Sequence, residues 1–276
     1  MRRLTAVFLM AALMLGVLAG CGGKAEDNYI VLDENFGAEQ YGVGFRNEDI
    51  ALGTRVYELL DEMIADGKAA EISDKWFGKD ILLKDQSYLE DVTIPEGDTS
   101  LQDVLDKGEF VLGLDDSFPP MGYRDDQNNV VGFDIDLATE VCARMGVKLV
   151  IQPIDWDSKE LELSNGSIDC VWNGMSIDDS RLAAMFIPKA YVANTQIIIV
   201  PESSGIKTKA DLAGKTVGLQ KGSTALSALQ KDEATAASVK EIIEYEDNVE
   251  VYLDLQAGRI DVFVVDEVVG RYLISQ

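Results

Sequence analysis

From Leu101 to the end of the chain, short apolar segments alternate with amphipathic segments. The apolar segments predict strands, and the amphipathic ones, whose apolar residues recur at helical spacing, predict helices. Parallel strands need crossover connections of about a dozen residues or more, and these are usually helical. The alternation therefore predicts βαβ units and an α/β fold class. The predicted strands cover residues 110–114, 147–152, 169–172, 195–200, 215–219, 241–245 and 260–265.

The two ends of the chain do not fit this alternation. The chain stops on a predicted helix that opens at Asp266, where a further strand would be expected. It starts with a predicted strand at residues 29–33 that no helix precedes. A second strand at residues 41–46 and two helices, ended by Gly67 and Gly78, follow it. The polar stretch at residues 84–99 has no period and is predicted to be a linker.

The first residues predict an exported, lipid-anchored protein. Arg2 and Arg3 precede an apolar run that is too short to span a bilayer comfortably, which is typical of a signal peptide over residues 1–20. The run ends in Leu-Ala-Gly-Cys, which resembles the bacterial lipobox and implies cleavage before Cys21 and lipidation of its thiol. Residues 21–27 would then be a polar tether. The alternative is a plain secretory signal with an unmodified Cys21.

The charge of the chain excludes several classes of function. It has 49 acidic and 24 basic residues, and without Arg2 and Arg3 its formal charge is about −27. This charge argues against nucleic acid as a partner and against electrostatic docking on anionic lipid. The absence of His removes Ser-His and Cys-His catalysis and the commonest zinc ligand. No metal or cofactor is predicted.

Two cysteines remain besides the one in the lipobox. Cys142 lies on the apolar face of a predicted helix and Cys170 in a predicted strand. Both are expected to be buried free thiols. A disulfide between them is the alternative.

One stretch, Trp172–Arg181 (WNGMSIDDSR), suggests an anion site. Asn173-Gly174 is a turn signal, and Ser176 with an acidic residue three positions later is a helix-start signature. Free backbone N–H groups at such a helix start favour an anion, and the fork of Arg181 matches a carboxylate. The alternative is an ordinary capped helix with a solvated arginine. By similar reasoning, Asp134 is expected to cap the helix at residues 133–145.

Several motifs, taken together, resemble the polar amino-acid branch of the periplasmic substrate-binding proteins of ABC transporters. In family order they are LGLDDSFPPMGY, VGFDIDLATEV, GSIDCVWNGMSIDDSR, DLAGKTVGLQKGST and LQAGRIDVFVVDEVVGRYLI. The segment that begins NYIVLDENFGAEQYGVGFRNED is similar to the C-terminal end of the same family, yet here it comes first. The chain therefore resembles a circularly permuted member of this family.

The resemblance implies a fold and its domain boundaries. The family has a two-lobed, type II periplasmic-binding-protein (Venus flytrap) fold of the α/β class. Lobe 1 would comprise residues 43–83 and 100–190, and lobe 2 residues 28–36 and 196–276. The hinge strands would be residues 37–42 and 191–195. Residues 84–99 would join the family's usual termini.

The same resemblance implies which residues bind a free amino acid. Arg181 and Ser176 would hold its carboxylate, together with N–H groups of Gly222, Ser223 and Thr224. Asp266 and the carbonyl of Gly174 would accept from its ammonium, although Asp266 as a plain helix cap is the alternative.

Four further residues would surround the ligand's side chain. Phe118 and Trp156 match aromatic positions that sandwich it, and Asp115 matches a position that can read its polar end. Asn173 stands where binders of basic amino acids have a small hydroxyl residue, which favours a polar or sulfur-containing ligand.

The function implied is that of a monomeric, non-enzymatic protein that captures a free amino acid and delivers it to an ABC permease. Two alternatives are open. One is a sensor that reports its ligand to a receptor. The other is a dehydratase on the same fold, which would need a general acid or base in the cleft, and only Lys159, Glu160 and Lys221 are candidates for it.

Overall fold

The computed structural model describes residues 28–84 and 92–276. The predicted signal peptide (1–20), the tether (21–27) with Cys21, and residues 85–91 of the predicted linker lie outside the described residues. Within the described part of the chain, no helix combines the length and the apolar character needed to cross a bilayer.

The main sheet has nine strands in the order β11-β10-β12-β9-β2-β8-β3-β7, with β1 paired to β9 off this path. A small sheet has the order β4-β5-β6. The strands are β1 (Tyr29–Val31), β2 (Ala38–Gly44), β3 (Glu109–Leu114), β4 (Ser117–Phe118), β5 (Gly122–Arg124), β6 (Val130–Val131), β7 (Lys148–Pro153), β8 (Cys170–Ser176), β9 (Ala190–Pro201), β10 (Thr216–Gln220), β11 (Glu241–Tyr245) and β12 (Val262–Asp266).

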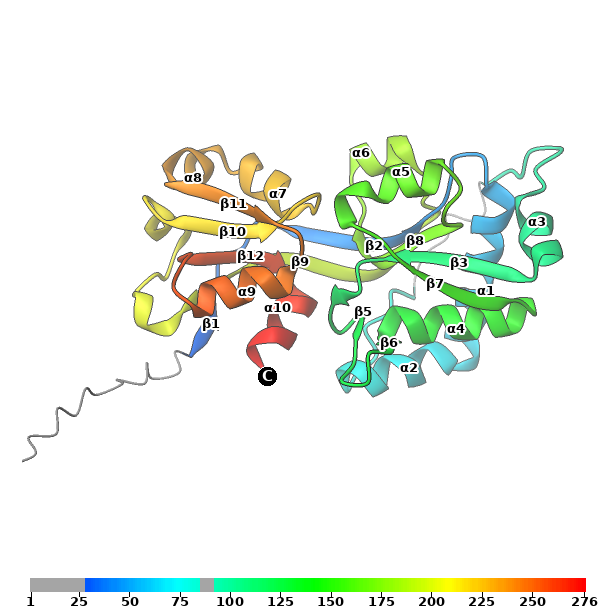
Figure 1. The fold of residues 1–276 in the computed structure, drawn as a ribbon, viewed down its shortest axis with the longest axis horizontal. Helices are drawn as coiled ribbons and strands as arrows, with labels where there is room; N and C mark the ends of the chain where they lie inside the picture. The colour runs from blue at the N-terminus through cyan, green and yellow to red at the C-terminus, as the bar shows by residue number, and fades with distance from the viewer. Residues whose placement is uncertain (1–27, 85–91) are drawn as a thin grey trace, which may run out of the picture.

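The helices fall into two sets that cover the two ends of this sheet (Figure 1). We call β3–β8 with α1–α6 the β3 half, and β1 and β10–β12 with α7–α10 the β10 half. The helices are α1 (Ile50–Asp66), α2 (Lys68–Phe77), α3 (Ser100–Lys107), α4 (Phe133–Met145), α5 (Lys159–Ser164), α6 (Asp179–Ala184), α7 (Ala225–Lys231), α8 (Glu233–Ser238), α9 (Asn248–Gln256) and α10 (Glu267–Ile274), with short 3-10 turns at Trp156–Ser158 (η2), Glu202–Ser204 (η3) and Lys209–Leu212 (η4).

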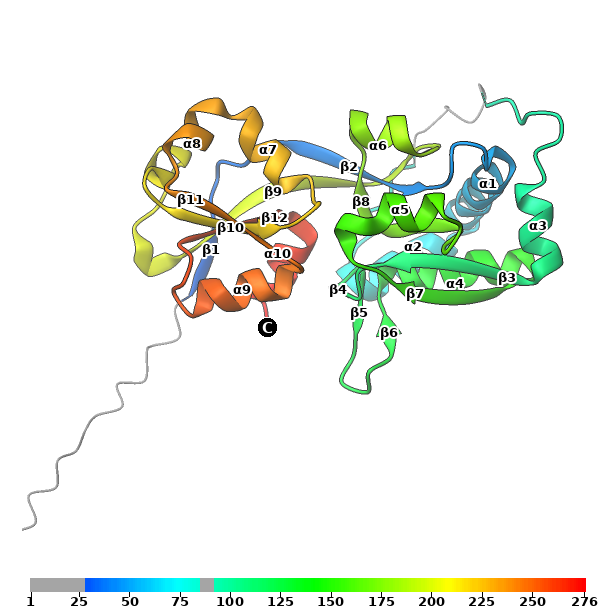
Figure 2. The same cartoon turned by 45° about the horizontal axis from the view of Figure 1, so that its top comes forward.

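Strands β2 and β9 run between the two halves and pair with each other (Figures 1 and 2). Within the halves β3 is parallel to β7 and β8, and β10 is parallel to β11 and β12, so the predicted α/β class is confirmed. β9 is long enough to pair with β2 along its first part and with β12 along its second. Ala190–Thr195 pair with β2, and Gln196–Ile199 pair with β12.

The turn predicted at Asn173-Gly174 and the helix start predicted at Ser176 are both wrong. Asn173 and Gly174 do not form a turn, because both lie inside β8, between β2 and β3. Ser176 is the last residue of β8 and not a helix cap. The cap of α6 is Asp178, whose carboxylate accepts from the backbone N–H of Arg181 at 2.8 Å. Pairing of the flanking residues Val171 and Met175 with β2 keeps the segment in the strand, although the strand is irregular here and Gly174 has a positive φ of 54°.

Asp134 is a fully buried residue of α4 and not its cap. Its carboxylate accepts from the hydroxyl of Tyr191 at 2.8 Å and from the backbone N–H of Gly174 at 2.7 Å. Burial raises the pKa of Asp134 to about 7, against the lowering effect of these hydrogen bonds. The carboxylate thereby ties α4 to β8 and β9.

The two cysteines are as predicted. Cys142 in α4 and Cys170 in β8 are both buried and free. Burial raises the pKa of the Cys142 thiol to about 12, so the thiol is protonated at neutral pH and unreactive.

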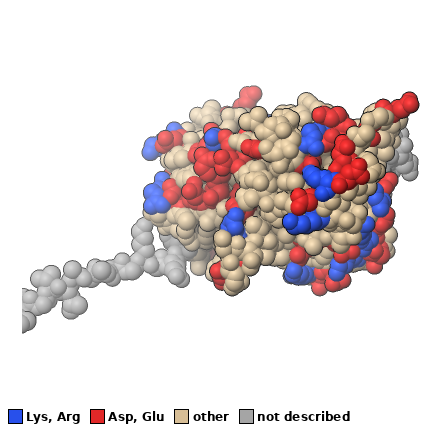
Figure 3. Space-filling view, turned by 45° about the vertical axis from the view of Figure 1, so that its right-hand side comes forward, with Lys and Arg blue, Asp and Glu red and all other residues tan. Residues whose placement is uncertain are grey.

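The surface is strongly acidic. Figure 3 shows acidic side chains over both halves of the molecule, with fewer basic ones among them. The exposed acidic residues of β11 and the loop that follows it include Glu241, Glu244 and Glu246. No broad basic face that could track a nucleic-acid backbone is visible in this view.

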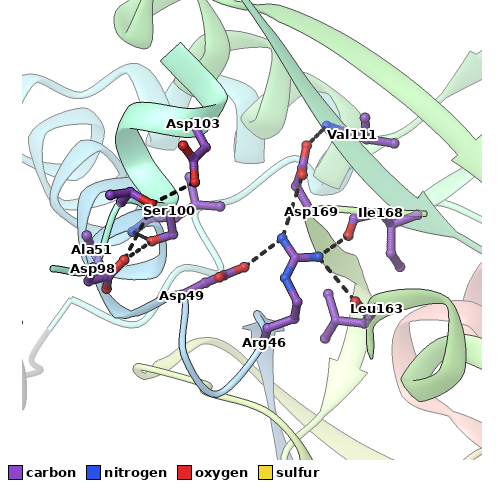
Figure 4. Close-up of polar contacts among 12 residues, drawn as sticks. Arg46, Asp49, Ala51, Asp98, Ser100, Asp103, Val111, Leu163, Ile168 and Asp169 are labelled. Atoms are coloured by element: carbon purple, nitrogen blue, oxygen red, sulfur yellow. Dashed lines mark hydrogen bonds and ion pairs between the residues drawn. The ribbon is translucent and has the colours of Figure 1, made fainter. Parts of the chain in front are cut away.

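A network of charges joins β2 to the β3 half (Figure 4). Arg46, just after β2, donates to the carbonyls of Leu163 at 3.1 Å and Ile168 at 2.6 Å. It also forms ion pairs with Asp49 at 2.7 Å and Asp169 at 3.8 Å. This guanidinium therefore holds the start of α1 against β8.

The start of α1 is capped by residues from another part of the chain. Asp98 accepts from the backbone N–H of Ala51 at 2.7 Å, and Ser100 accepts from that of Leu52 at 3.1 Å (Figure 4). Asp98 also accepts from the backbone N–H and hydroxyl of Ser100, at the start of α3. One carboxylate thus satisfies free N–H groups at two helix starts.

Replacing this carboxylate should destabilise the protein. We expect Asp98→Ala to lower the free energy of unfolding by about 1 kcal/mol, because capping side chains typically contribute that much. Urea denaturation followed by circular dichroism measures the change. Asp126→Ala, on an exposed loop, is the matched control and should have no measurable effect. Equal stability of the two variants would contradict the capping role.

Candidate functional site

A small cavity lies where the two halves meet. Five of its lining residues come from the β3 half and four from the β10 half: Phe118, Trp156, Gly174, Ser176 and Arg181, and Gln220, Ser223, Thr224 and Asp266. Its volume is about 10 Å³, which is room for roughly one water molecule. The structure therefore brings eight of the eleven predicted binding residues around one space.

Arg181 crosses from one half to the other. It is almost fully buried in α6, and its guanidinium donates to the carbonyl of Ser176 at 2.6 Å. It also donates to the carbonyl of Gly222, in the β10 half, at 3.0 Å. Burial lowers the pKa of Arg181, and the nearby carboxylates oppose this effect. A guanidinium has five N–H donors, so donors remain for a further anion.

A second buried cation, Lys159, was not predicted to bind the ligand. Its ammonium donates to the carbonyls of Trp156 and Gly222, both at 3.1 Å, and forms an ion pair with Glu160 at 3.2 Å. Burial and then the charge of Arg181 lower its pKa. Two cations from the β3 half thus donate to the same carbonyl of the β10 half.

The loop that carries Gly222 fits tightly against the β3 half. Gly222 has a positive φ of 68°, and a Cβ there would lie 2.8 Å from Cα of Asp157. The preceding residue, Lys221, forms an ion pair with Asp157 at 2.7 Å. Glycine is therefore required for this approach of the two halves.

The two predicted aromatic residues border the cavity. Lys159 Nζ lies 5.1 Å and Arg181 Cζ 5.9 Å from the ring centroid of Trp156, so the indole faces both cations. Phe118 touches the backbone of Gly174, where an added Cβ would lie 2.8 Å from the phenyl ring. Both rings are buried.

Asp115 and Asn173 lie behind the cavity wall and not on it. Asp115 accepts from the amide of Gln220 at 2.7 Å and from the backbone N–H of Ser117 at 2.8 Å. Burial raises the pKa of Asp115 to about 6. Asn173 accepts from the backbone N–H of Asp115 at 3.2 Å, and its own buried Nδ2 has no hydrogen-bond partner. Asp115 therefore links the ends of β3 and β10.

Asp266 faces the cavity and does not cap α10. Its Oδ1 accepts from the hydroxyl of Tyr41 at 2.9 Å and from the amide of Asn194, and it makes no capping bond. Burial, followed by the charge of Glu39, raises its pKa to about 7. The side chains of Tyr41 and Asn194 that hold it come from β2 and β9.

Several residues on the cavity wall or bonded to it were not predicted to bind the ligand: Glu39, Tyr41, Lys159, Asn194, Gln196 and Gln220. A polar residue on a strand carries no local sign that it faces a cleft. For Glu39 and Tyr41 the missing information was the pairing of β2 with β8 and β9, which brings them beside Ser176 and Asn194.

Comparison with known proteins gives the family. Residues 110–244 match the family model of bacterial extracellular solute-binding proteins, family 3. A solved ABC uptake transporter substrate-binding protein from Streptococcus pneumoniae, with bound histidine, is 36% identical. The match has a TM-score of 0.63 and covers 66% of this chain and 74% of that one. The chain belongs to family 3 of the bacterial extracellular solute-binding proteins. The similarity to this solved structure confirms the predicted two-lobed, type II fold.

Two curated relatives of this solute-binding protein come from Escherichia coli (strain K12). The L-cystine-binding protein is 28% identical over 178 residues, or 64% of this chain and 65% of its own length. The lysine/arginine/ornithine-binding periplasmic protein is 34% identical over 158 residues, which are 57% of this chain and 60% of its own length. The matches to these relatives thus span less than two thirds of their length.

Proposed function

We propose that this protein captures a free amino acid between its two halves and delivers it to an ABC permease. One observation carries the proposal. A buried cation, Arg181, and a buried carboxylate, Asp266, line the same cavity from opposite halves. A zwitterionic amino acid has a charge of each sign, and both must be paired if the cleft is to close over it without a large desolvation penalty.

Each charged end of the ligand has candidate partners. Arg181 and the hydroxyl of Ser176 would bind the carboxylate, together with N–H groups of residues 222–224. Asp266 and the carbonyl of Gly174 would accept from the ammonium. The ligand must displace the carbonyl of Gly222 from Arg181 on the way.

The cavity is too small for an amino acid, so the halves must separate for entry. Separation breaks the ion pair between Lys221 and Asp157 and the contact between Gln220 and Asp115. We propose residues 37–42 and 191–195 as the hinge strands, because β2 and β9 connect the halves. Ligand contacts to both halves would then stabilise the closed state.

We propose a polar or sulfur-containing amino acid as the ligand. Phe118 and Trp156 supply the aromatic walls, and Asn173 and Asp115 supply polarity behind them. One relative binds cystine, whereas others bind histidine or lysine, arginine and ornithine. Binding is favoured over catalysis because the groups suited to proton transfer at or behind the cavity wall, Lys159, Asp115 and Asp266, are engaged in hydrogen bonds within the protein.

A screen of ligands tests this function. We expect at least one of the twenty amino acids or cystine to raise the melting temperature, since a ligand that binds only the folded state stabilises it. Arg181→Ala should weaken binding of that amino acid at least about thirtyfold in calorimetry, as expected for loss of a buried charge partner. Arg55→Ala, on the exposed face of α1, is the matched control. Unchanged affinity of Arg181→Ala would refute the carboxylate assignment.

We also propose that the chain is a circular permutant, with lobe 1 formed by residues 43–83 and 100–190 and lobe 2 by residues 28–36 and 196–276. Tyr29 and Ile274, near the two ends of the described chain, line one cavity of about 640 Å³. β1 and the C-terminus lie in the same half in both ribbon views (Figures 1 and 2). At the other junction, Leu83, just before the linker, donates to the carbonyl of Tyr191 in β9. Asp98, near the end of the linker, accepts from the backbone N–H of Ala51 in α1.

Reordering the chain tests the permutation. A variant with residues 100–276 placed before residues 28–83 should fold, with a melting temperature within a few degrees of the parent and the same ligand. The reason is that chains tolerate permutation when both junctions fall at exposed, neighbouring ends. An unfolded or non-binding variant would count against the proposed order.

We further propose that Cys21 carries a lipid that anchors the protein outside the cytoplasm, as the lipobox resemblance implies. Cys21→Ser should then release the protein from the membrane fraction of expressing bacteria. Immunoblotting of membrane and soluble fractions measures this, with Cys142→Ser as the control. A variant that stays with the membrane would exclude anchoring through Cys21.

A further inference from the structure

Glu39 is a half-buried carboxylate on β2 that contacts Ser176, a residue of the cavity wall. Its Oε2 accepts from the hydroxyl of Ser176 at 2.6 Å. It also accepts from the amide of Gln196 at 3.0 Å and from that of Asn194 at 3.2 Å. All three donors are neutral, so no cation from the described part of the chain pairs directly with this carboxylate.

Glu39 and Asp266 form a pair of carboxylates. The same amide nitrogen, Nδ2 of Asn194, donates to Oε2 of Glu39 and to Oδ1 of Asp266. Two carboxylates that share one donor lie within a few ångströms of each other and repel. This repulsion is the second cause, after burial, of the raised pKa of Asp266.

A third acceptor beside this pair lacks a donor. Gln196 is fully buried, and its Nε2 donates to Glu39 and, at 3.3 Å, to Thr224 on the cavity wall. Its Oε1 is buried without any hydrogen-bond partner. An unpaired buried acceptor is costly, so this position calls for a donor that residues 28–84 and 92–276 do not supply.

We infer that Glu39, Asp266 and Oε1 of Gln196 together bind a primary ammonium group of the ligand. An ammonium has three N–H donors and no acceptor, which matches three acceptors of which two are anionic. A metal ion fits less well, because residues 28–84 and 92–276 contain no group of three or more His, Cys, Asp or Glu side chains arranged to hold one. The inference rests on the proposed function and revises one part of it: Glu39 and Gln196 take the place of the carbonyl of Gly174 as partners of the ammonium beside Asp266.

Binding an ammonium at this pair should depend on pH. The charged and titratable groups that face Asp266 are Glu39 and Tyr41 from β2 and Arg181 from α6. The pKa of Asp266 in the empty cleft is about 7, and the ammonium requires its ionised form. Binding therefore expels a proton below that pH. Affinity should fall about tenfold for each pH unit below about 7 and level off above it.

The experiment is calorimetric titration of the full-length protein from pH 5.5 to 8 with L-cystine, L-histidine, L-arginine and L-glutamine as probes. Glu39→Gln keeps the size of the side chain and removes its charge. For every probe that binds, we expect this variant to bind about tenfold more weakly at pH 8. The pH at which its affinity begins to fall should also be lower, because Asp266 loses a repelling neighbour. Gln196→Leu should likewise bind more weakly.

Glu241→Gln, an exposed residue of β11, is the matched control for the change in net charge and should stay within twofold of the parent. Parent-like affinity and pH profile in Glu39→Gln would overturn the inference while leaving the proposed function intact. Tighter binding by Glu39→Gln would also overturn it, since Glu39 would then compete with the ligand carboxylate for Ser176. If the parent protein binds none of the four probes, the assignment of Glu39, Asp266 and Gln196 to an ammonium is overturned. The proposed function fails only if the wider screen of amino acids and cystine is also negative.

Discussion

The antiparallel pairing of β2 with β9 is the constraint on which the rest of the structure depends. Only these strands pair across the two halves of the described chain, and β9 continues from β2 onto β12. Their side chains also define one end of the cleft. Glu39 and Tyr41 project from β2, and Asn194 and Gln196 from β9, around the carboxylate of Asp266. A change in the angle between the halves therefore acts directly on the groups that surround this carboxylate.

Much of the fold was predictable because its signals are local. The helix containing Val56, Leu60 and Met63 has an apolar face at helical spacing, and the strand at residues 110–114 is an unbroken apolar run. The turn predicted at Asn173-Gly174 failed for the opposite reason. The residues on either side of it, Val171 and Met175, pair with β2, which lies about 130 residues earlier in the chain, and no window around residue 173 contains that information.

The residues of the candidate site likewise differ in whether a local pattern marks them. Arg181 stood out from a local pattern, an arginine in the first turn of a helix that follows a strand, and the family resemblance then implied its role. Lys159 and Glu39 did not, since a charged residue on a short helix or a strand is usually solvated. Their burial depends on contacts with Gly222 and with β9, which are 63 and more than 150 residues away in sequence. Local pattern and resemblance together thus point to Arg181, but not to the buried charges around it.

The carbonyl of Gly222 accepts from both Lys159 and Arg181, and this has a consequence for ligand binding. An acceptor held by a single donor would be left bare, at a high cost in free energy, whenever an incoming anion recruited that donor. When the halves close again over a ligand whose carboxylate takes the guanidinium of Arg181, the ammonium of Lys159 would still be available to donate to this carbonyl. The closed state with ligand would then leave neither the ligand carboxylate nor the Gly222 carbonyl without a donor.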